Sequence, residues 1–354
     1  MLTLTWTNVG TSAINDTDGF NSVFDNVSPT AAATARNVVF AALQTWDQVF
    51  ANYNNGSNNI NVSISMNTSG TGFGGAGGPS ASTGGRPTVG SITINRGNDA
   101  QSDGIGDGGG WFLDPTPFDH SEFVTGSGSD IRNAFVGTSG TNLGSDLFSI
   151  VTIELSHVLG LLGNSSNNPT LLYQTGPDLL GSPNSPTGDE FLTPILDSMN
   201  NPVADPTGNA SGFLWRFTGP TTTALMTSYN SGGGGTNFGP GVHSAEGTSG
   251  NGTGFEGSVV AGGLSGSEDV GNAFFIGSTR YLPSNLMASL LSDAYGYTLA
   301  NVNGAEAFGT FYAVLNQASG QLTIRGGDDN DMSVDVITLS QSGSNLVVSV
   351  NIGN

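Results

Sequence analysis

The stretch GSDLFSIVTIELSHVLGLLG, residues 144–163, decides the fold. Its apolar residues recur at three- and four-residue spacing and cover nearly the whole circumference of a helix, which is typical of a buried helix. Glu154 and His157 interrupt this pattern. A charge buried without a partner costs several kcal/mol, so the two residues predict either a polar pair or a bound metal ion.

A second, longer helix is predicted upstream, within NVSPTAAATARNVVFAALQTWDQVFANY at residues 26–53. Ser28 suits the N-cap position, and Pro29 suits the first turn. One apolar face follows from the spacing of Val39, Leu43, Trp46 and Phe50. A third helix is predicted at 280–297, with Ser284 as its cap and Gly296 as its stop.

Alternation of apolar and polar residues predicts strands at 2–8, 59–66 and 90–95. The segment SGTGFGGAGGPSASTGGRP, residues 69–87, lies between the last two of these strands. Its glycine content predicts a mobile loop. Helices and strands together give an α+β fold with long loops.

The pattern changes after about residue 305, where alternating segments at 308–316, 320–326, 335–340 and 344–352 predict four strands. We therefore expect two units, a main domain at 1–304 and a small β-rich C-terminal module at 305–354. The last segment stops in mid-strand, so we expect the native chain to continue beyond Asn354.

Composition excludes several classes of protein. The chain of 354 residues has 28 acidic and 7 basic residues, a net charge of −21, and no cysteine. This charge argues against nucleic-acid binding and against anionic membranes, which attract basic patches. Disulfides are excluded, and no apolar run reaches the ~20 residues of a membrane helix. The lysine-free, glycine-rich composition is typical of a secreted or surface-displayed bacterial chain, including one that self-associates.

The helix of Glu154 and His157 resembles the active helix of secreted bacterial zincin-type zinc metalloproteases, which carry His-Glu-x-x-His. The segments GGGWFLDPTP, LWRFTGP, GVHSAEG and RYLPSNLMASLLSDAYGY resemble the same family, so the resemblance covers most of the chain. It implies a zincin-like domain that hydrolyses peptide bonds with zinc-activated water. By carry-over, Glu154 is the general base, and His157 and His243 are zinc ligands.

Two positions depart from the family pattern. Ile153 stands where the first zinc-binding histidine belongs, and isoleucine has no lone pair. Gly271, in DVGNA, stands where the family has the methionine of a turn beneath the metal. Catalytic zinc sites use three protein ligands, so loss of one weakens metal binding and peptidase activity.

Several interpretations remain open on the sequence alone. The protein is a weakened peptidase, or a catalytically inactive relative that serves as a surface, filament or binding protein, or a calcium-dependent adhesin. Glu154 and His157 could also be a polar pair without metal. In this last interpretation His243 is an ordinary loop residue, as His120 is expected to be.

Acidic residues gather in the glycine-rich stretch GNDAQSDGIGDGGGWFLDPTPFDHSE, residues 97–122. Oxygen-rich loops suit calcium, which takes 6–8 oxygen ligands. Asp103, Asp107 and Asp114 are therefore candidate calcium ligands, although their spacing does not match an EF-hand. The alternative is a solvated acidic loop. The same two alternatives apply to GGDDNDMSVD, residues 326–335, in the C-terminal module.

Overall fold

The computed structural model describes a mixture of helices and strands. The described residues are 3–117, 122–123, 135–138, 143–160, 192–194, 198–201, 215–217, 220–221, 279–283, 285–299, 312–316, 321–325, 336–342 and 345–351. The described residues contain both helices and strands, and the zincin-like α+β fold class stays a prediction. No helix among these residues is long and apolar enough to cross a membrane.

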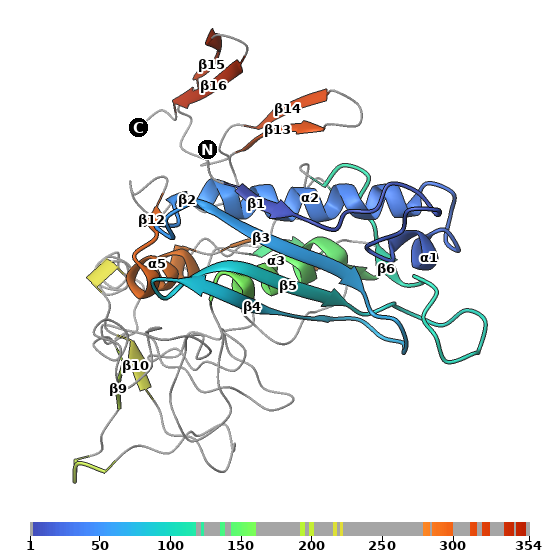
Figure 1. Ribbon diagram of the computed structural model, residues 1–354, viewed down its shortest axis with the longest axis horizontal. Coiled ribbons are helices and arrows are strands. Elements are labelled where there is room, and N and C mark those ends of the chain that lie inside the picture. Colours follow the sequence, from blue (N-terminus) through green and yellow to red (C-terminus); the bar gives the residue numbers. More distant parts are fainter. Residues whose placement is uncertain are drawn as a thin grey trace.

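A four-stranded sheet forms one layer of the fold, in the order β1-β3-β5-β4 (Figure 1). The strands β1 (Thr3–Trp6), β3 (Asn59–Met66) and β5 (Arg86–Ile94) are parallel, and β4 (Gly75–Thr83) is antiparallel to β5. β3 buries every second residue, as its alternation predicts. β1 and β4 are therefore the two edge strands.

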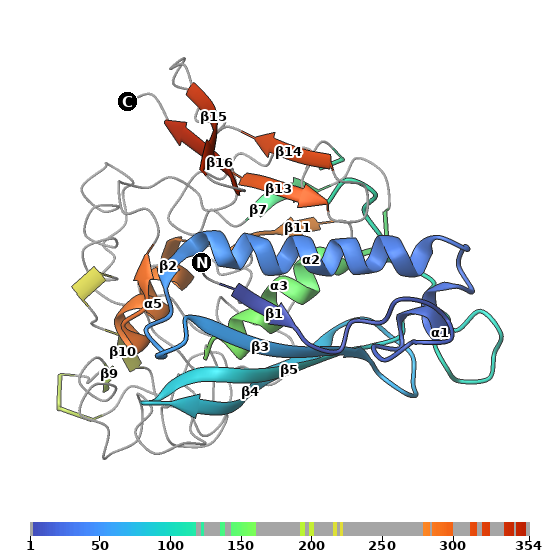
Figure 2. The same ribbon diagram turned by 45° about the horizontal axis from the view of Figure 1, so that its top comes forward.

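The second layer consists of the helices α2 (Ala31–Val49) and α3 (Leu147–Val158). α2 contacts β1, and α3 contacts β4 and β5 (Figure 2). The two helices also contact each other, and the Trp46 indole N–H donates to the Thr152 carbonyl at 2.8 Å. The apolar faces of both helices and the inner face of the sheet form one hydrophobic core.

The predicted start of the first long helix is wrong by two residues. α2 begins at Ala31, its N-cap is Thr30, and no side chain caps it. The Ser28 N–H instead bonds the Phe24 carbonyl at 3.3 Å, and the Ser28 carbonyl accepts the Ala31 N–H at 3.1 Å. Ser28 therefore belongs to the turn that follows the short helix α1 (Phe20–Phe24). Because this turn occupies the predicted cap position, α2 begins two residues further along the chain.

The predicted mobile loop at 69–87 is also wrong, because its centre is the edge strand β4. Pairing with β5 satisfies its backbone along one side, and a bulge lies between Pro79 and Ala81. Glycine has low strand propensity, so this strand could not be recognised from its residue pattern. Its position is set instead by close packing against α3, described below.

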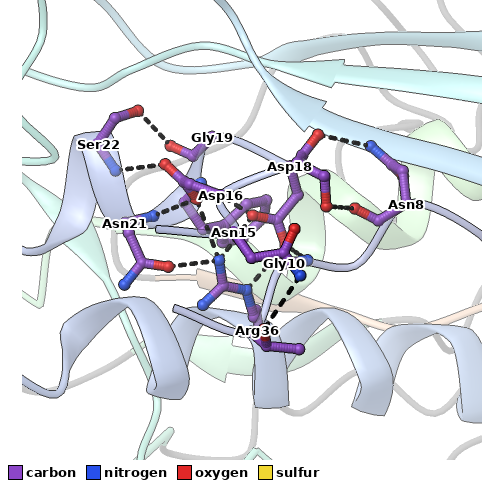
Figure 3. Close-up of polar contacts among 12 residues, drawn as sticks. Asn8, Gly10, Asn15, Asp16, Asp18, Gly19, Asn21, Ser22 and Arg36 are labelled. Carbon is purple, nitrogen blue, oxygen red and sulfur yellow. Dashed lines mark hydrogen bonds and ion pairs between the residues drawn. The ribbon is translucent and has the colours of Figure 1, made fainter. Parts of the chain in front are cut away.

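A buried ion pair fixes the loop before α1 to α2 (Figure 3). Nε and one Nη of Arg36 donate to the two carboxylate oxygens of Asp18 at 2.8 and 2.7 Å. The same guanidinium contacts Asp16 at 3.2 Å and the Asn21 side-chain oxygen at 2.7 Å. Burial alone would raise the pKa of Asp18, but Arg36 and the N–H groups of Gly10 and Phe20 lower it below its ordinary value.

Outside the four-stranded sheet, short strands pair two by two, and several of these pairs join segments far apart in the sequence. β11 (Thr279–Tyr281) pairs with β7 (Phe135–Thr138), and β12 (Thr298–Leu299) pairs with β2 (Phe50–Asn52). Between β11 and β12 lies α5 (Asn285–Tyr295), and Gly296, the predicted stop, follows it directly with φ +66°. The predicted helix at 280–297 is wrong at its start, because residues 280 and 281 belong to β11, and its predicted cap Ser284 lies outside the described residues. The other short pairs are β6 (Trp111–Phe112) with β8 (Ser145–Asp146), and β9 (Leu192–Pro194) with β10 (Trp215–Phe217).

The four C-terminal strands predicted from alternation are present as two antiparallel hairpins. β13 (Tyr312–Asn316) pairs with β14 (Gln321–Arg325), and β15 (Val336–Ser342) pairs with β16 (Asn345–Asn351). β13 also contacts α2 (Figure 2). The division into units 1–304 and 305–354 stays a prediction.

Candidate functional site

The helix α3 carries the candidate site, and its first turn is fixed by Asp146. The Asp146 side chain caps the helix by accepting from the Ser149 N–H at 3.3 Å and from the Ser149 hydroxyl at 2.6 Å. The Ser149 hydroxyl oxygen in turn accepts the Tyr281 backbone N–H at 2.8 Å. The start of α3 is thus bonded directly to β11.

Arg280 in β11 completes this arrangement and is fully buried. Its Nε and one Nη donate to the two oxygens of Asp146 at 3.0 and 2.8 Å, and the other Nη donates to Asp114 at 2.7 Å. The guanidinium also lies 4.5 Å from the ring centroid of Phe123 and 4.7 Å from that of Phe148. Burial raises the pKa of Asp114, and Arg280 opposes that shift.

Glu154 and His157 lie one turn apart on α3, and both side chains are buried, with exposed fractions of 6% and 4%. Glu154 lies directly against the edge strand β4. A Cβ added at Gly75 would lie 2.9 Å from Glu154 Cγ, and one added at Gly77 would lie 2.6 Å from the Glu154 carbonyl oxygen. These two glycines permit helix and strand to approach this closely, which explains why the strand is glycine-rich.

Ile153 occupies the position of the absent first histidine and belongs to the hydrophobic core, with 3% of its surface exposed. It lies four residues before His157 and therefore shares a helix face with it. The face on which the family pattern places two imidazoles thus carries one imidazole and one aliphatic side chain.

The last turn of α3 is held by two tyrosines that flank the end of α5. The Tyr297 hydroxyl donates to the Leu159 carbonyl at 2.9 Å, and the Tyr295 hydroxyl donates to the Gly160 carbonyl at 2.8 Å. The first bond satisfies the C-cap carbonyl, which a helix leaves without an intrahelical partner, and the second holds the residue that follows the cap. Gly160 has φ +110°, and the Tyr295 ring leaves no room there for a Cβ. The segment 279–297 therefore fixes both ends of α3.

The donor set in the described part of the chain does not fit a three-ligand zinc site. Glu154 and His157 are the only residues of the predicted constellation that it contains, and the described residues include no group of three metal-ligating side chains. His243, His120 and Gly271 lie outside the described residues. Zinc ligation by His157 and His243, with Glu154 as general base, therefore stays a prediction.

The candidate calcium ligands lie in two different environments. Asp103 accepts the Ile105 N–H at 2.8 Å, and Asp107 accepts the Ala100 N–H at 3.2 Å, both within the loop that follows β5. Asp114 instead pairs with Arg280, so a cation already contacts its carboxylate. A calcium site made of all three residues stays a prediction, as does one in 326–335, a segment that lies outside the described residues.

The loop that holds Asp103 is also organised by a neighbour. The Asp99 carboxylate accepts the N–H groups of Gln101, Ser102 and Gly104 at 3.0, 2.7 and 2.8 Å. These hydrogen bonds, with that of Gly104 the strongest influence, lower the pKa of Asp99. Backbone amides thus organise this loop, and no metal is needed to explain its shape.

Sequence reasoning missed Arg280, Tyr295 and Tyr297 as supports of the candidate helix. One signal was available, since an arginine lying just before the apolar run of α5 is unusual among only 7 basic residues. Its partners could not be read from the chain, because Asp146 precedes it by 134 residues and Asp114 by 166.

Comparison with known proteins returns no relative. No family model matches the chain, and neither a curated protein nor a solved structure matches it. The zincin resemblance thus rests on the motif residues and on the four further segments quoted with them.

Proposed function

We propose that this chain is a secreted metalloendopeptidase-like protein with a zincin-like domain, whose peptidase activity is weakened or lost. The proposal is supported most directly by the arrangement of Glu154, His157 and Ile153 on one buried helix. Glutamate and histidine remain at the motif spacing beside an edge strand, and a core isoleucine replaces the first ligand.

Bound zinc with three protein ligands supplies an activated water for peptide hydrolysis. Two histidines could come from α3 in the family pattern, but here the helix offers one. Loss of a direct ligand is more severe than the 10–100-fold loss in affinity that follows removal of an outer-shell partner. We therefore propose polypeptide as the ancestral substrate and expect little turnover from the present chain.

A second candidate is a catalytically inactive relative that acts as an extracellular surface, filament or binding protein. The packing of Gly75 and Gly77 against Glu154 favours this second candidate. A general base must reach the zinc-activated water, and here β4 covers the Glu154 side chain. The net charge of the chain, −21, suits an exported, well-hydrated protein.

The experiment compares zinc content and casein cleavage in the full chain, Ile153→His and Ile153→His/Glu154→Gln. We expect substoichiometric zinc and negligible cleavage in the unaltered protein. Ile153→His should bind zinc near one equivalent, and any cleavage it gains should disappear when Glu154 becomes glutamine. Ile153→Val is the matched control, since it changes the same core position without adding a donor.

The outcomes separate the two candidates. Cleavage that appears only in Ile153→His supports a lapsed peptidase, and zinc binding without cleavage supports the inactive relative. If Ile153→His is folded and binds no zinc, both the assignment of the site to α3 and the zincin proposal are wrong.

A further inference from the structure

Asp47, near the C-terminal end of α2, holds the first strand of the sheet. Its Oδ1 and Oδ2 accept the Leu4 backbone N–H at 2.9 and 3.1 Å. Oδ1 also accepts the Tyr53 hydroxyl at 3.0 Å. β1 is an edge strand that pairs only with β3 in the described sheet. One carboxylate therefore joins a helix, an edge strand and the segment that follows β2.

The surroundings of this carboxylate disfavour its charged form. Asp47 lies near the end of α2 where the helix carbonyls gather, which is unfavourable for an anion. Tyr53 is fully buried, and its ring packs against Phe50 and Tyr297. Burial raises the pKa of Asp47 to about 6, although the hydrogen bonds from Tyr53 and Leu4 act in the opposite direction.

The groups that face Asp47 do not supply a compensating charge. The Tyr53 phenol, in the segment that follows β2, faces Asp47 directly. The Tyr297 phenol, in the segment that follows α5, packs against Tyr53. Burial raises the pKa of both phenols well above the ordinary value, so both stay neutral. β1 offers a backbone N–H, and no ion pair to Asp47 exists within the described residues.

We propose that Asp47 is a pH-sensitive latch on β1: its bond to Leu4 is held in acid and loosens as the pH rises from about 4 to about 6. Opening of β1 hydrates the carboxylate and returns it to an ordinary carboxylic acid, which ionises more readily. Protons therefore favour the closed state. A difference of about two pKa units changes the opening equilibrium by up to about a hundredfold.

The state in which β1 has separated from Asp47 exposes apolar and backbone groups that are covered when β1 is bound. β1 carries Trp6, whose ring packs against Phe20 and Phe40 at centroid distances of 5.5 and 5.2 Å. Release of β1 exposes this indole and the edge of β3 with which Thr3–Trp6 pair. An unpaired strand edge is a template for association with another chain. The Asp47 latch therefore controls whether the edge of β3 is covered by β1 or exposed.

The experiment is hydrogen exchange of the full chain at pH 4.5 and pH 8, followed in the peptide that covers residues 3–9 and corrected for intrinsic exchange. Part of the loss has already occurred at pH 4.5, so the unaltered protein should lose about thirtyfold in protection between the two pH values. Asp47→Asn keeps the acceptor for Leu4 and has no charge, so its protection should be nearly constant. Asp25→Asn, at an exposed carboxylate, is the control and should behave like the unaltered protein.

A second variant tests the cause. Tyr53→Phe removes a hydrogen bond that favours the charged carboxylate, so the midpoint of the protection loss should move to higher pH. The proposal is overturned if Asp47→Asn retains the full pH dependence, or if the unaltered protein shows none. A Tyr53→Phe midpoint that stays unchanged or moves to lower pH would also overturn it.

Discussion

Asp146 and Arg280 form a bidentate ion pair, with nitrogen–oxygen distances of 3.0 and 2.8 Å, between residues 134 positions apart in the chain. Asp146 caps α3, and Arg280 belongs to β11. The helix of Glu154 and His157 is therefore oriented by a strand that follows it far along the sequence.

Removal of the guanidinium should destabilise the protein strongly. Arg280→Met leaves Asp114 and Asp146 buried without their cation, and breaking one side of a buried ion pair costs about 3–5 kcal/mol. Urea unfolding followed by circular dichroism measures the change. Arg96→Met is the comparison and should cost less, because within the described residues the Arg96 guanidinium donates to carbonyl groups and to no carboxylate. Equal losses in the two variants would contradict the special role of Arg280.

Addition of one methyl group to β4 should disturb the candidate helix. A Cβ at Gly77 would meet the Glu154 carbonyl oxygen at 2.6 Å, so Gly77→Ala forces helix and strand apart at a cost of about 1–3 kcal/mol. Ala76→Ser, at the exposed neighbouring position, should be nearly neutral. Thermal unfolding of both variants checks this. A neutral Gly77→Ala would mean that β4 does not pack on α3 as described.

The tyrosines at the end of α3 should contribute through their hydroxyl groups. Tyr295→Phe and Tyr297→Phe each keep the ring and leave one carbonyl, at Gly160 or Leu159 just after α3, without this donor. Each change should cost about 1–2 kcal/mol in the free energy of unfolding. If the hydrogen exchange of 155–160 stayed unchanged in both variants, the two bonds would not hold the helix end.

Acid should weaken the Asp18–Arg36 pair. The pKa of Asp18 is lowered in the folded state, so its stabilising contribution is fully present above the ordinary value of 3.8. The contribution is lost as the pH falls through the lower, folded value. Asp18→Asn should therefore destabilise the protein by about 2–3 kcal/mol at pH 7, and the difference should shrink at pH 2.5. Urea titrations at the two pH values test this. A constant difference would show that the charge of Asp18 is not involved.

Sequence periodicity was sufficient for much of the fold. The alternation in NINVSISM predicted β3 residue for residue, and the spacing of Val39, Leu43 and Trp46 predicted the buried face of α2. These predictions succeeded because both patterns record which side of one element faces the core. They failed at Ser28 and in 69–87, where the outcome depended on a neighbouring turn and on α3.

The sequence by itself determined that Glu154 and His157 share a buried helix and that Ile153 supplies no metal ligand, because spacing and side-chain chemistry are local properties. Only the tertiary structure decided that β4 closes over Glu154 and that residues 279–297 hold both ends of α3. The same is true of the bond between Asp47 and Leu4. Each of these contacts joins residues more than 40 positions apart. Such pairings are fixed by how the layers pack, and no periodicity within one segment encodes them.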